Sequence, residues 1–159
     1  LNNRRYFVEE GQNLVRKMVS EGTAFSIALM DLDHLKSIND EHGHDAGDAV
    51  LTQLADHLEN TFSRFHLARY GGEEFALVLP GLDVEKAYGL LDQFRRYVGE
   101  QLFILPDDDY LRVSVSTGLA SVTSPVGETL EGLLLKADEA LYLAKEGGRN
   151  LVTLYEPPT

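Results

Sequence analysis

Apolar residues recur at helical intervals in several stretches of the chain, which predicts helices there. These stretches cover residues 2–21, 47–62, 83–102 and 130–146. The first is expected to end near Gly22 and the last at Gly147 and Gly148, because glycine commonly terminates a helix. In each stretch the apolar residues share one side of the helix, so these helices are expected to pack against a sheet.

Shorter apolar or alternating stretches predict strands between the helices. They lie at residues 23–31, 66–70, 75–80, 111–122 and 151–155. The segments on either side of GGEE are expected to form a β-hairpin with Glu73 and Glu74 at its tip. Residues 31–48 are polar and punctuated by glycine, so we expect a loop outside the core, with one helical turn around residues 35–38.

The predicted order is helix, strand, helix, two strands, helix, strand, helix, strand. Hairpin strands between helical crossovers predict a mixed sheet with helices packed on it, a fold of the α/β (α+β) class. The 159 residues suit one domain over residues 1–159, and neither an internal repeat nor a linker interrupts them. With 43% hydrophobic and 25% charged residues, the composition is that of an ordinary globular protein.

Charge and residue content exclude several classes of function. A net charge of −12 argues against a nucleic-acid surface, which is built from clustered lysine and arginine. The apolar stretches fall far short of the ~20 residues of a membrane span and no signal peptide is visible, so we expect no membrane contact by this domain. The absence of cysteine rules out disulfides and thiolate chemistry. It is compatible with a location in the cytoplasm, whether the domain is free or part of a membrane-anchored protein. A phosphate ligand requires a divalent cation and local basic residues in one cleft.

Two pairs of carboxylates suggest a metal site. Asp31 and Asp33 end the first predicted strand, a common place for the oxygen ligands of Mg²⁺, and Glu73 and Glu74 lie on the glycine hairpin. Alternate residues of a strand face opposite sides, so only one of Asp31 and Asp33 is expected to be a ligand. If the hairpin and the strand end meet, the carboxylates repel one another unless a cation lies between them. Otherwise the pairs fit a helix cap and an exposed turn equally well.

Other ligand sites fit this part of the sequence less well. DLDHLKSINDEH begins like an EF-hand loop, but Lys36 stands where the loop needs glycine and His42 where it needs glutamate. His42 and His44 suggest zinc only weakly, because no clear third ligand accompanies them. Lys145 and Arg149 bracket two glycines, which fits either favourable charge at a helix C-terminus or a phosphate clamp. Neither a Walker loop nor a dinucleotide fingerprint is present.

Several motifs in one order are more specific than any of them alone. The chain contains DLDHLKSINDEHGHDAGDAVL, ARYGGEEF, VSVSTGLA and ADEALYLAKEGGRN. Together they resemble the GGDEF family of diguanylate cyclases, over nearly the whole chain. The resemblance implies a central five-stranded sheet wrapped by helices, similar to nucleotidyl cyclases and polymerase palm domains. It also implies that two GTP molecules are joined into cyclic di-GMP, with release of two pyrophosphates.

The resemblance further implies roles for individual residues. The catalytic and metal-binding set, for Mg²⁺ or Mn²⁺, comprises Asp31, the backbone carbonyl of Leu32, Glu73 and, beside the metals, Glu74. The substrate-binding set comprises Leu35, Lys36, Asn39, Asp48, Gly71, Gly72, Lys145 and Arg149. In this set Asn39 and Asp48 read guanine, and the basic residues hold the β and γ phosphates. The glycines let the backbone approach the nucleotide, since a side chain would occupy its space or resist a positive φ.

The implied substrate also sets the expected base preference and assembly. Guanine offers two adjacent donors to Asp48, whereas adenine would leave this carboxylate unpaired at a cost of about 1–3 kcal/mol or more. One site holds one GTP, so two domains must face each other as a homodimer. A chain that opens at LNNRRY is expected to be a piece of a larger protein with a regulatory input domain on its N-terminal side.

The chain departs from the family pattern at two places. Leu35 stands where the family often has phenylalanine, a conservative exchange. The product-inhibition motif Arg-x-x-Asp falls on residues 62–65, which read FSRF, so we expect no tight binding of cyclic di-GMP there. A catalytically silent GTP-binding module and a dimerising scaffold remain as alternatives to an active cyclase. Silent relatives usually lose signature residues that this chain retains.

Overall fold

The centre of the protein is a five-stranded sheet in the order β2-β3-β1-β6-β7. A computed structural model describes residues 1–158. The strands of the sheet are β1 (Phe25–Leu32), β2 (His66–Arg69), β3 (Glu74–Pro80), β6 (Val115–Val122) and β7 (Val152–Leu154). A separate two-stranded sheet contains β4 (Phe103–Ile104) and β5 (Tyr110–Leu111). Neighbouring strands of the main sheet are antiparallel except β6 and β7, which confirms the expected mixed five-stranded sheet.

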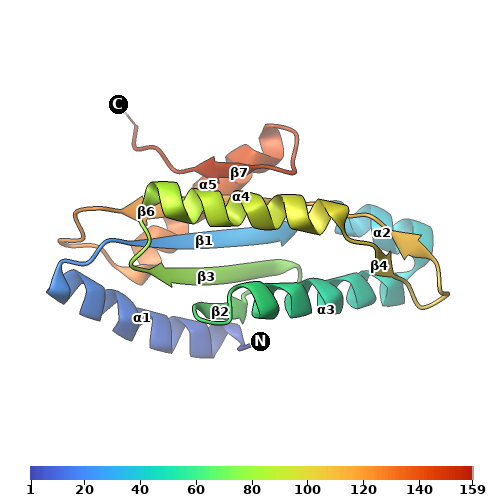
Figure 1. The fold of residues 1–159 in the computed structure, drawn as a ribbon, viewed down its shortest axis with the longest axis horizontal. Coiled ribbons are helices and arrows are strands. Elements are labelled where there is room, and N and C mark those ends of the chain that lie inside the picture. Colours follow the sequence, from blue (N-terminus) through green and yellow to red (C-terminus); the bar gives the residue numbers. More distant parts are fainter. Residues whose placement is uncertain (159) are drawn as a thin grey trace.

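Helices cover both faces of this sheet (Figure 1). They are α1 (Arg4–Glu21), α2 (Leu35–His42), α3 (His44–Thr61), α4 (Val84–Glu100) and α5 (Leu130–Glu146). Phe25, Ile27 and Leu29 of β1 join the core under α1 and α5. Ala28 and Met30 join the core under α3 and α4. Because both faces are covered, every residue of β1 is buried, which explains its continuous apolar sequence.

The close crossing of α5 over β6 depends on Gly118. A Cβ atom on this residue would lie 2.1 Å from the carbonyl oxygen of Ala137 and 2.3 Å from the amide nitrogen of Leu141. Both atoms belong to the backbone of α5, which cannot turn aside as a flexible side chain can. A larger residue at this position would therefore push α5 away from the sheet.

The segment from residue 31 to residue 48 is more helical than its polar sequence predicts. It forms all of α2 and the start of α3, so the expectation of a loop outside the core is wrong. Ile38 is 6% exposed and Ala46 is 1% exposed, and these two side chains anchor the helices in the core. Gly43, with a φ of 90°, makes the turn between them. Tertiary packing thus stabilises helices whose own sequence is mostly polar.

The strand predicted at residues 111–122 is divided in two. β6 begins only at Val115, Leu111 belongs to β5 in the small sheet, and residues 112–114 between them are in neither strand. Gln53 of α3 fixes that small sheet, because its side-chain amide accepts a hydrogen bond from the Ile104 N–H and donates one to the Ile104 carbonyl. The helix predicted to reach residue 102 ends at Glu100, because the chain leaves the helix there to enter β4 at Phe103.

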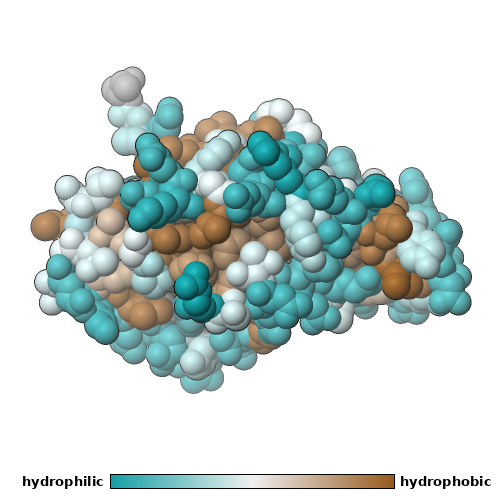
Figure 2. Space-filling model, viewed as in Figure 1, coloured by the Kyte–Doolittle hydropathy of each residue, from teal (hydrophilic) through white to brown (hydrophobic). Residues whose placement is uncertain are grey.

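Hydrophilic residues cover much of the surface seen in Figure 2. Hydrophobic residues show in the middle of this view and near the end that carries β4. Leu102, Ile104 of β4 and Tyr110 of β5 are exposed. Within residues 1–158, no helix has both the length and the apolar character that crossing a membrane requires.

Candidate active site

Asp31 lies near the C-terminal end of β1, in the middle of the main sheet. It pairs with Glu74 of β3 on one side and with Ser116 of β6 on the other. The connection between β2 and β3 therefore brings Glu73 and Glu74 to the same edge of the sheet as Asp31. The strand end and the hairpin meet, which is the arrangement in which the carboxylates repel one another, although Glu74 is the first residue of β3 rather than part of the hairpin tip.

Asp31 is a buried carboxylate with one paired oxygen, and the residue is only 3% exposed. Its Oδ2 atom accepts a hydrogen bond from the ammonium group of Lys145, which reaches it from α5. Its Oδ1 atom is buried and has no hydrogen-bond partner within residues 1–158. An unpaired buried carboxylate oxygen is unfavourable, so this atom is where a cation would stabilise the site most.

The acidic groups around Asp31 are protonated more readily than isolated ones. Burial raises the pKa of Asp31, although its contact with Lys145 opposes the rise. Burial and then the charge of Asp31 raise the pKa of Glu73. The same two causes, with the charge of Asp138, raise the pKa of Glu74 to about 7. Burial lowers the pKa of Lys145, but the hydrogen bond and charge of Asp31 outweigh it, so the net pKa is raised. The carboxylates of this cluster therefore repel one another, and Lys145 compensates only part of their charge.

The donor atoms at this point suit a divalent cation. Asp31 and Glu73 offer carboxylate oxygens and Leu32 offers a backbone carbonyl, the hard oxygen donors that Mg²⁺ prefers. Among the described residues 1–158, no group of three or more Asp, Glu, His or Cys side chains is arranged to hold a metal ion. The expected set needs only two carboxylates, because its third donor is a carbonyl. The unpaired Asp31 oxygen and the raised pKa values of the glutamates agree with a cation at this place.

A small cleft of about 160 Å³ opens beside Asp31. The predicted site residues that line it are Asp31, Leu32, Leu35, Lys36, Glu73, Lys145 and Arg149. They come from β1, α2, the hairpin, α5 and the segment after α5. The fold thus gathers oxygen donors and basic side chains from distant parts of the sequence. Lys36, Lys145 and Arg149 offset the negative charge of the molecule in this one place.

Glu74 lines a different and larger hollow, of about 480 Å³, between α1 and α5. Asp138 and Arg4 also line it, and Cζ of Arg4 lies 4.4 Å from the centre of the Tyr70 ring. The two hairpin glutamates therefore belong to different cavities. Glu73 shares the cleft of Asp31, whereas Glu74 is the neighbour of Asp31 across the sheet, near enough for the charge of Asp31 to raise the Glu74 pKa.

Asn39 and Asp48 do not line the small cleft but lie on the neighbouring helices α2 and α3. Asp48 is exposed to solvent. Asn39 packs against Gly47, where a Cβ atom would lie 2.0 Å from Asn39 Oδ1. That oxygen is buried and has no hydrogen-bond partner within residues 1–158. Gly47 therefore provides the space in which the Asn39 side chain sits.

Gly71 and Gly72 are exposed in the turn between β2 and β3. Neither has a positive φ, so of the two reasons offered for glycine here, only space for a nucleotide remains. A Cβ atom on Gly72 would meet no described atom within 4 Å, and one on Gly71 would meet only Cβ of Glu74, at 3.6 Å. Arg69 holds the turn by donating hydrogen bonds from its guanidinium to the Gly72 carbonyl. The chain leaves space here, so a need for glycine would come from a ligand.

Asp33 has a role that sequence reasoning missed. It is 3% exposed and lines the same small cleft as Asp31, but its two oxygens accept hydrogen bonds from the hydroxyl groups of Ser114 and Ser116. Only one of Asp31 and Asp33 was expected to be a ligand; both line the small cleft, but their hydrogen-bond partners differ. The alternation in VSVS was the available signal, because it places both serines on one face of the neighbouring chain segment.

A comparison with protein families identifies the chain's relatives. The family model described as "Diguanylate cyclase, GGDEF domain" matches residues 1–151. The response regulator PleD of Caulobacter vibrioides is 38% identical over 154 residues, which are 96% of this chain but 34% of PleD. The chain therefore spans about a third of the length of that curated relative.

Solved structures share the fold described above. The GGDEF domain of DgcB from Caulobacter crescentus, in complex with c-di-GMP, is 34% identical, with a TM-score of 0.92 over 99% of this chain and 90% of that one. The active GGEEF domain of a diguanylate cyclase from Vibrio cholerae is 31% identical, with a TM-score of 0.88 over 99% of each chain. The similarity extends over the whole sheet and its helices rather than over one motif.

Proposed function

The chain belongs to the GGDEF domain family of diguanylate cyclases, and from this membership we propose that it is itself an active cyclase. In the proposed reaction, the 3′-hydroxyl of one GTP attacks the α-phosphorus of a second GTP and displaces pyrophosphate. The reciprocal attack closes the ring, so two GTP give one cyclic di-GMP and two pyrophosphates. The observation that carries the proposal is the unpaired Asp31 oxygen beside a cleft that also contains Glu73 and basic side chains.

Asp31, the Leu32 carbonyl and Glu73 are the residues that would hold Mg²⁺ or Mn²⁺. When bound, the cation polarises the α-phosphate and lowers the pKa of the attacking hydroxyl. Glu73 contributes because the charge of Asp31, after burial, raises its pKa, and this repulsion favours a shared cation. The proposed metal site is therefore built from groups that destabilise one another without it.

Lys36, Lys145 and Arg149 are the proposed ligands of the β and γ phosphates. All three line the cleft of Asp31, and Lys145 already neutralises one oxygen of that carboxylate. The guanidinium of Arg149 can donate two parallel hydrogen bonds to phosphate oxygens, whereas the lysines supply compact charges. The open space at Gly71 and Gly72 supports the approach of the nucleotide to the hairpin.

Asp48 and Asn39 are the proposed readers of guanine, with Leu35 beside the base. A carboxylate at Asp48 accepts from the N1–H and N2 amino donors of guanine, whereas adenine offers neither of these donors. The exposure of Asp48 leaves it accessible to such a ligand. The base preference would follow from these two helices rather than from the metal cleft.

A homodimer is part of the proposal, because each domain binds one GTP and the reaction joins two. The two sites must face each other across a two-fold axis, so that each hydroxyl lies in line with the opposite α-phosphorus. Control of this encounter by an N-terminal input domain would make the longer protein a regulated enzyme of the cytoplasm.

The surface at residues 62–65 is not a tight product site in this proposal. Phe62 is 1% exposed and its ring packs 5.3 Å from that of Phe94, so it stabilises the core instead of offering a cation. Arg64 is the one basic group of FSRF, and its Cζ atom lies 5.8 Å from the centre of the Phe65 ring. Without an aspartate partner, this segment lacks the charges that a cyclic dinucleotide would require.

The proposal is tested by incubating the protein with GTP and Mg²⁺ and separating the products by chromatography at several protein concentrations. Cyclic di-GMP should form, at a rate per molecule that rises with protein concentration. Glu73→Gln should reduce this rate by about 10-fold to 100-fold or more, as loss of a metal contact does, while the melting temperature stays close to that of the wild type. Glu10→Gln, which neutralises an exposed glutamate of α1, is the matched control and should keep full activity.

Three results distinguish the alternatives. Full activity in Glu73→Gln would refute the assignment of the metal site. GTP binding without any cyclic di-GMP, even at high protein concentration, would favour a silent GTP-binding module. An unchanged melting temperature with GTP and Mg²⁺ would favour a scaffold, because a ligand that binds the native state must stabilise it.

A further inference from the structure

We propose that Asp33 is a positioning residue that holds the loop after α5, and with it Arg149, in place for phosphate binding. The inference rests on the proposed function, in which Arg149 binds the β and γ phosphates. Asp33 lines the same cleft as Asp31, but its oxygens are bonded within the protein, and it acts on Arg149 through the next residue, Asn150.

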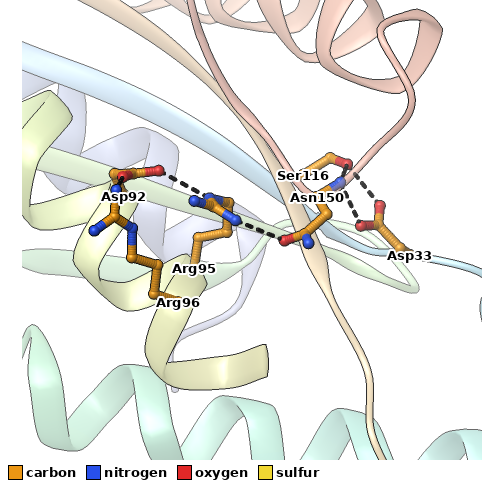
Figure 3. A network of polar contacts seen from close by, with 6 residues as sticks. All are labelled: Asp33, Asp92, Arg95, Arg96, Ser116 and Asn150. Carbon is orange, nitrogen blue, oxygen red and sulfur yellow. Dashed lines mark hydrogen bonds and ion pairs between the residues drawn. The ribbon is translucent and has the colours of Figure 1, made fainter. Parts of the chain in front are cut away.

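The carboxylate of Asp33 joins three separate parts of the chain. Its Oδ1 atom accepts a hydrogen bond from the Ser116 hydroxyl at 2.6 Å, and its Oδ2 atom accepts one from the Ser114 hydroxyl at 2.6 Å. Oδ2 also accepts the backbone N–H of Asn150 at 3.0 Å. The nitrogen of the same N–H lies 3.2 Å from the Ser116 hydroxyl oxygen, so both acceptors hold Asn150 (Figure 3).

The loop needs such a hold because its backbone is unfavourable for ordinary residues. Gly148, Arg149 and Asn150 have φ values of 113°, 65° and 52°, so three successive residues adopt positive φ. Glycine and asparagine tolerate this conformation, whereas arginine with its Cβ does not adopt it readily. Hydrogen bonds on either side of Arg149 fix it: its own N–H donates to the Ala144 carbonyl, and the next N–H donates to Asp33.

A second contact holds the same asparagine from the other side. Oδ1 of Asn150 accepts a hydrogen bond from Arg95 of α4 at 3.1 Å (Figure 3). Arg95 is in turn paired with Asp92 at 2.8 Å, and Asp92 also pairs with Arg96 at 3.1 Å. Asn150 is thus held by Asp33 through its backbone and by Arg95 of α4 through its side chain. These two contacts determine where the neighbouring residue Arg149 enters the cleft.

The partners of Asp33 distinguish it from Asp31 as a candidate ligand. Asp33 accepts three hydrogen bonds, so both of its oxygens are already satisfied by the protein. Asp31 instead keeps a buried oxygen without a partner within residues 1–158. A residue whose lone pairs are occupied by serine hydroxyls and a backbone N–H is suited to hold a loop rather than a cation.

The test compares binding of two nucleotides by the Asp33→Asn variant. The probes are GMP and a GTP analogue with a non-cleavable bridge between the α and β phosphates, titrated calorimetrically. Asparagine replaces one of the two acceptor oxygens of Asp33 with an NH₂ donor and removes the negative charge, so the charge-assisted hydrogen bond that holds the Asn150 N–H is lost. Affinity for the GTP analogue should fall by about tenfold, and that for GMP should not change, because GMP lacks the phosphates assigned to Arg149.

Two further variants separate positioning from general damage. In an Arg149→Ala background, Asp33→Asn should cause no additional loss, because both changes remove the same contact. Ser116→Ala removes one of the hydrogen bonds to Asp33 and should also weaken binding of the GTP analogue. This variant replaces Asp33→Asn in the test if Asp33→Asn does not fold. Ser26→Ala is the control: it removes buried hydrogen bonds to Ser121 and Leu82 at the opposite end of β1 and should leave both affinities unchanged.

The results that overturn the inference are distinct from failure of the proposed function. Equal weakening of GMP and the GTP analogue, additive losses with Arg149→Ala, or the same loss in Ser26→Ala would refute the positioning role. If the wild type binds no GTP analogue, the proposed function fails, and hydrogen exchange then decides on Asp33. Faster exchange of the Asn150 amide in Asp33→Asn would support its hold on the loop, and unchanged exchange would refute it.

Discussion

Neutralising Glu74 should stabilise the metal-free protein at high pH. Burial, the charge of Asp31 and the charge of Asp138 raise the pKa of Glu74 from 4.5 to about 7. The folded protein therefore binds this proton more tightly than the unfolded chain does. The favourable contribution is complete below the unfolded pKa and is lost as the pH rises through about 7, so ionised Glu74 weakens the native state in alkaline buffer. Glu74→Gln removes that penalty.

The size of the effect follows from the shift. A change from 4.5 to about 7 corresponds to ~3.4 kcal/mol at 1.36 kcal/mol per pH unit. Glu74 is only half-buried and solvent screens its charge, so we reduce the expected gain in unfolding free energy to about 1–2 kcal/mol. For a domain of this size each kcal/mol moves the melting temperature by about 2–4 °C. Glu74→Gln should therefore melt about 2–8 °C above the wild type at high pH.

The assay is thermal unfolding in the presence of a chelator at about pH 5 and about pH 8.5. The difference between Glu74→Gln and the wild type should be small at the lower pH and large at the higher one. Glu10→Gln removes the same charge from an exposed position and accounts for the general repulsion in a molecule of charge −12. A gain in Glu74→Gln that is equal at both pH values, or no larger than in Glu10→Gln, would refute the electrostatic account.

Three further predictions concern other parts of the molecule. Gly118→Ala should lower the free energy of unfolding by about 3 kcal/mol or more, because its Cβ would overlap the backbone of α5. Urea unfolding measures this loss, and a stability equal to that of the wild type would contradict the close crossing of α5 over β6. Gly47→Ala should raise the KM for GTP by about tenfold or more, because its Cβ would displace Asn39, one of the proposed readers of guanine. The KM is measured from the rate of cyclic di-GMP formation at several GTP concentrations. Cyclic di-GMP titrated calorimetrically should give no sub-micromolar site of two product molecules at residues 62–65, and finding one there would show that FSRF replaces the missing charges.

Much of the fold is readable from local pattern. The buried stretch of β1, the helices α1, α3, α4 and α5, and the hairpin around GGEE all follow from spacing of apolar residues and from glycine. Only one turn of α2, at residues 35–38, was predicted, because the stability of the whole helix comes from Ile38 packing in the core rather than from its own polar sequence. The division of the strand at 111–122 was missed for a similar reason, since Gln53 holds the neighbouring small sheet from another helix.

For the candidate site, too, one part could be predicted from the sequence and another part only from the structure. The sequence alone determined which chemical groups are available: carboxylates at Asp31 and Glu73, basic groups such as Arg149, and no cysteine. Only the tertiary structure decided that β3 and β6 flank β1, which brings these groups into one cleft, where an oxygen of Asp31 has no hydrogen-bond partner among residues 1–158. It also decided that Asp33 binds Asn150. Contacts between residues so far apart in the chain depend on strand order and helix packing, which no local pattern specifies.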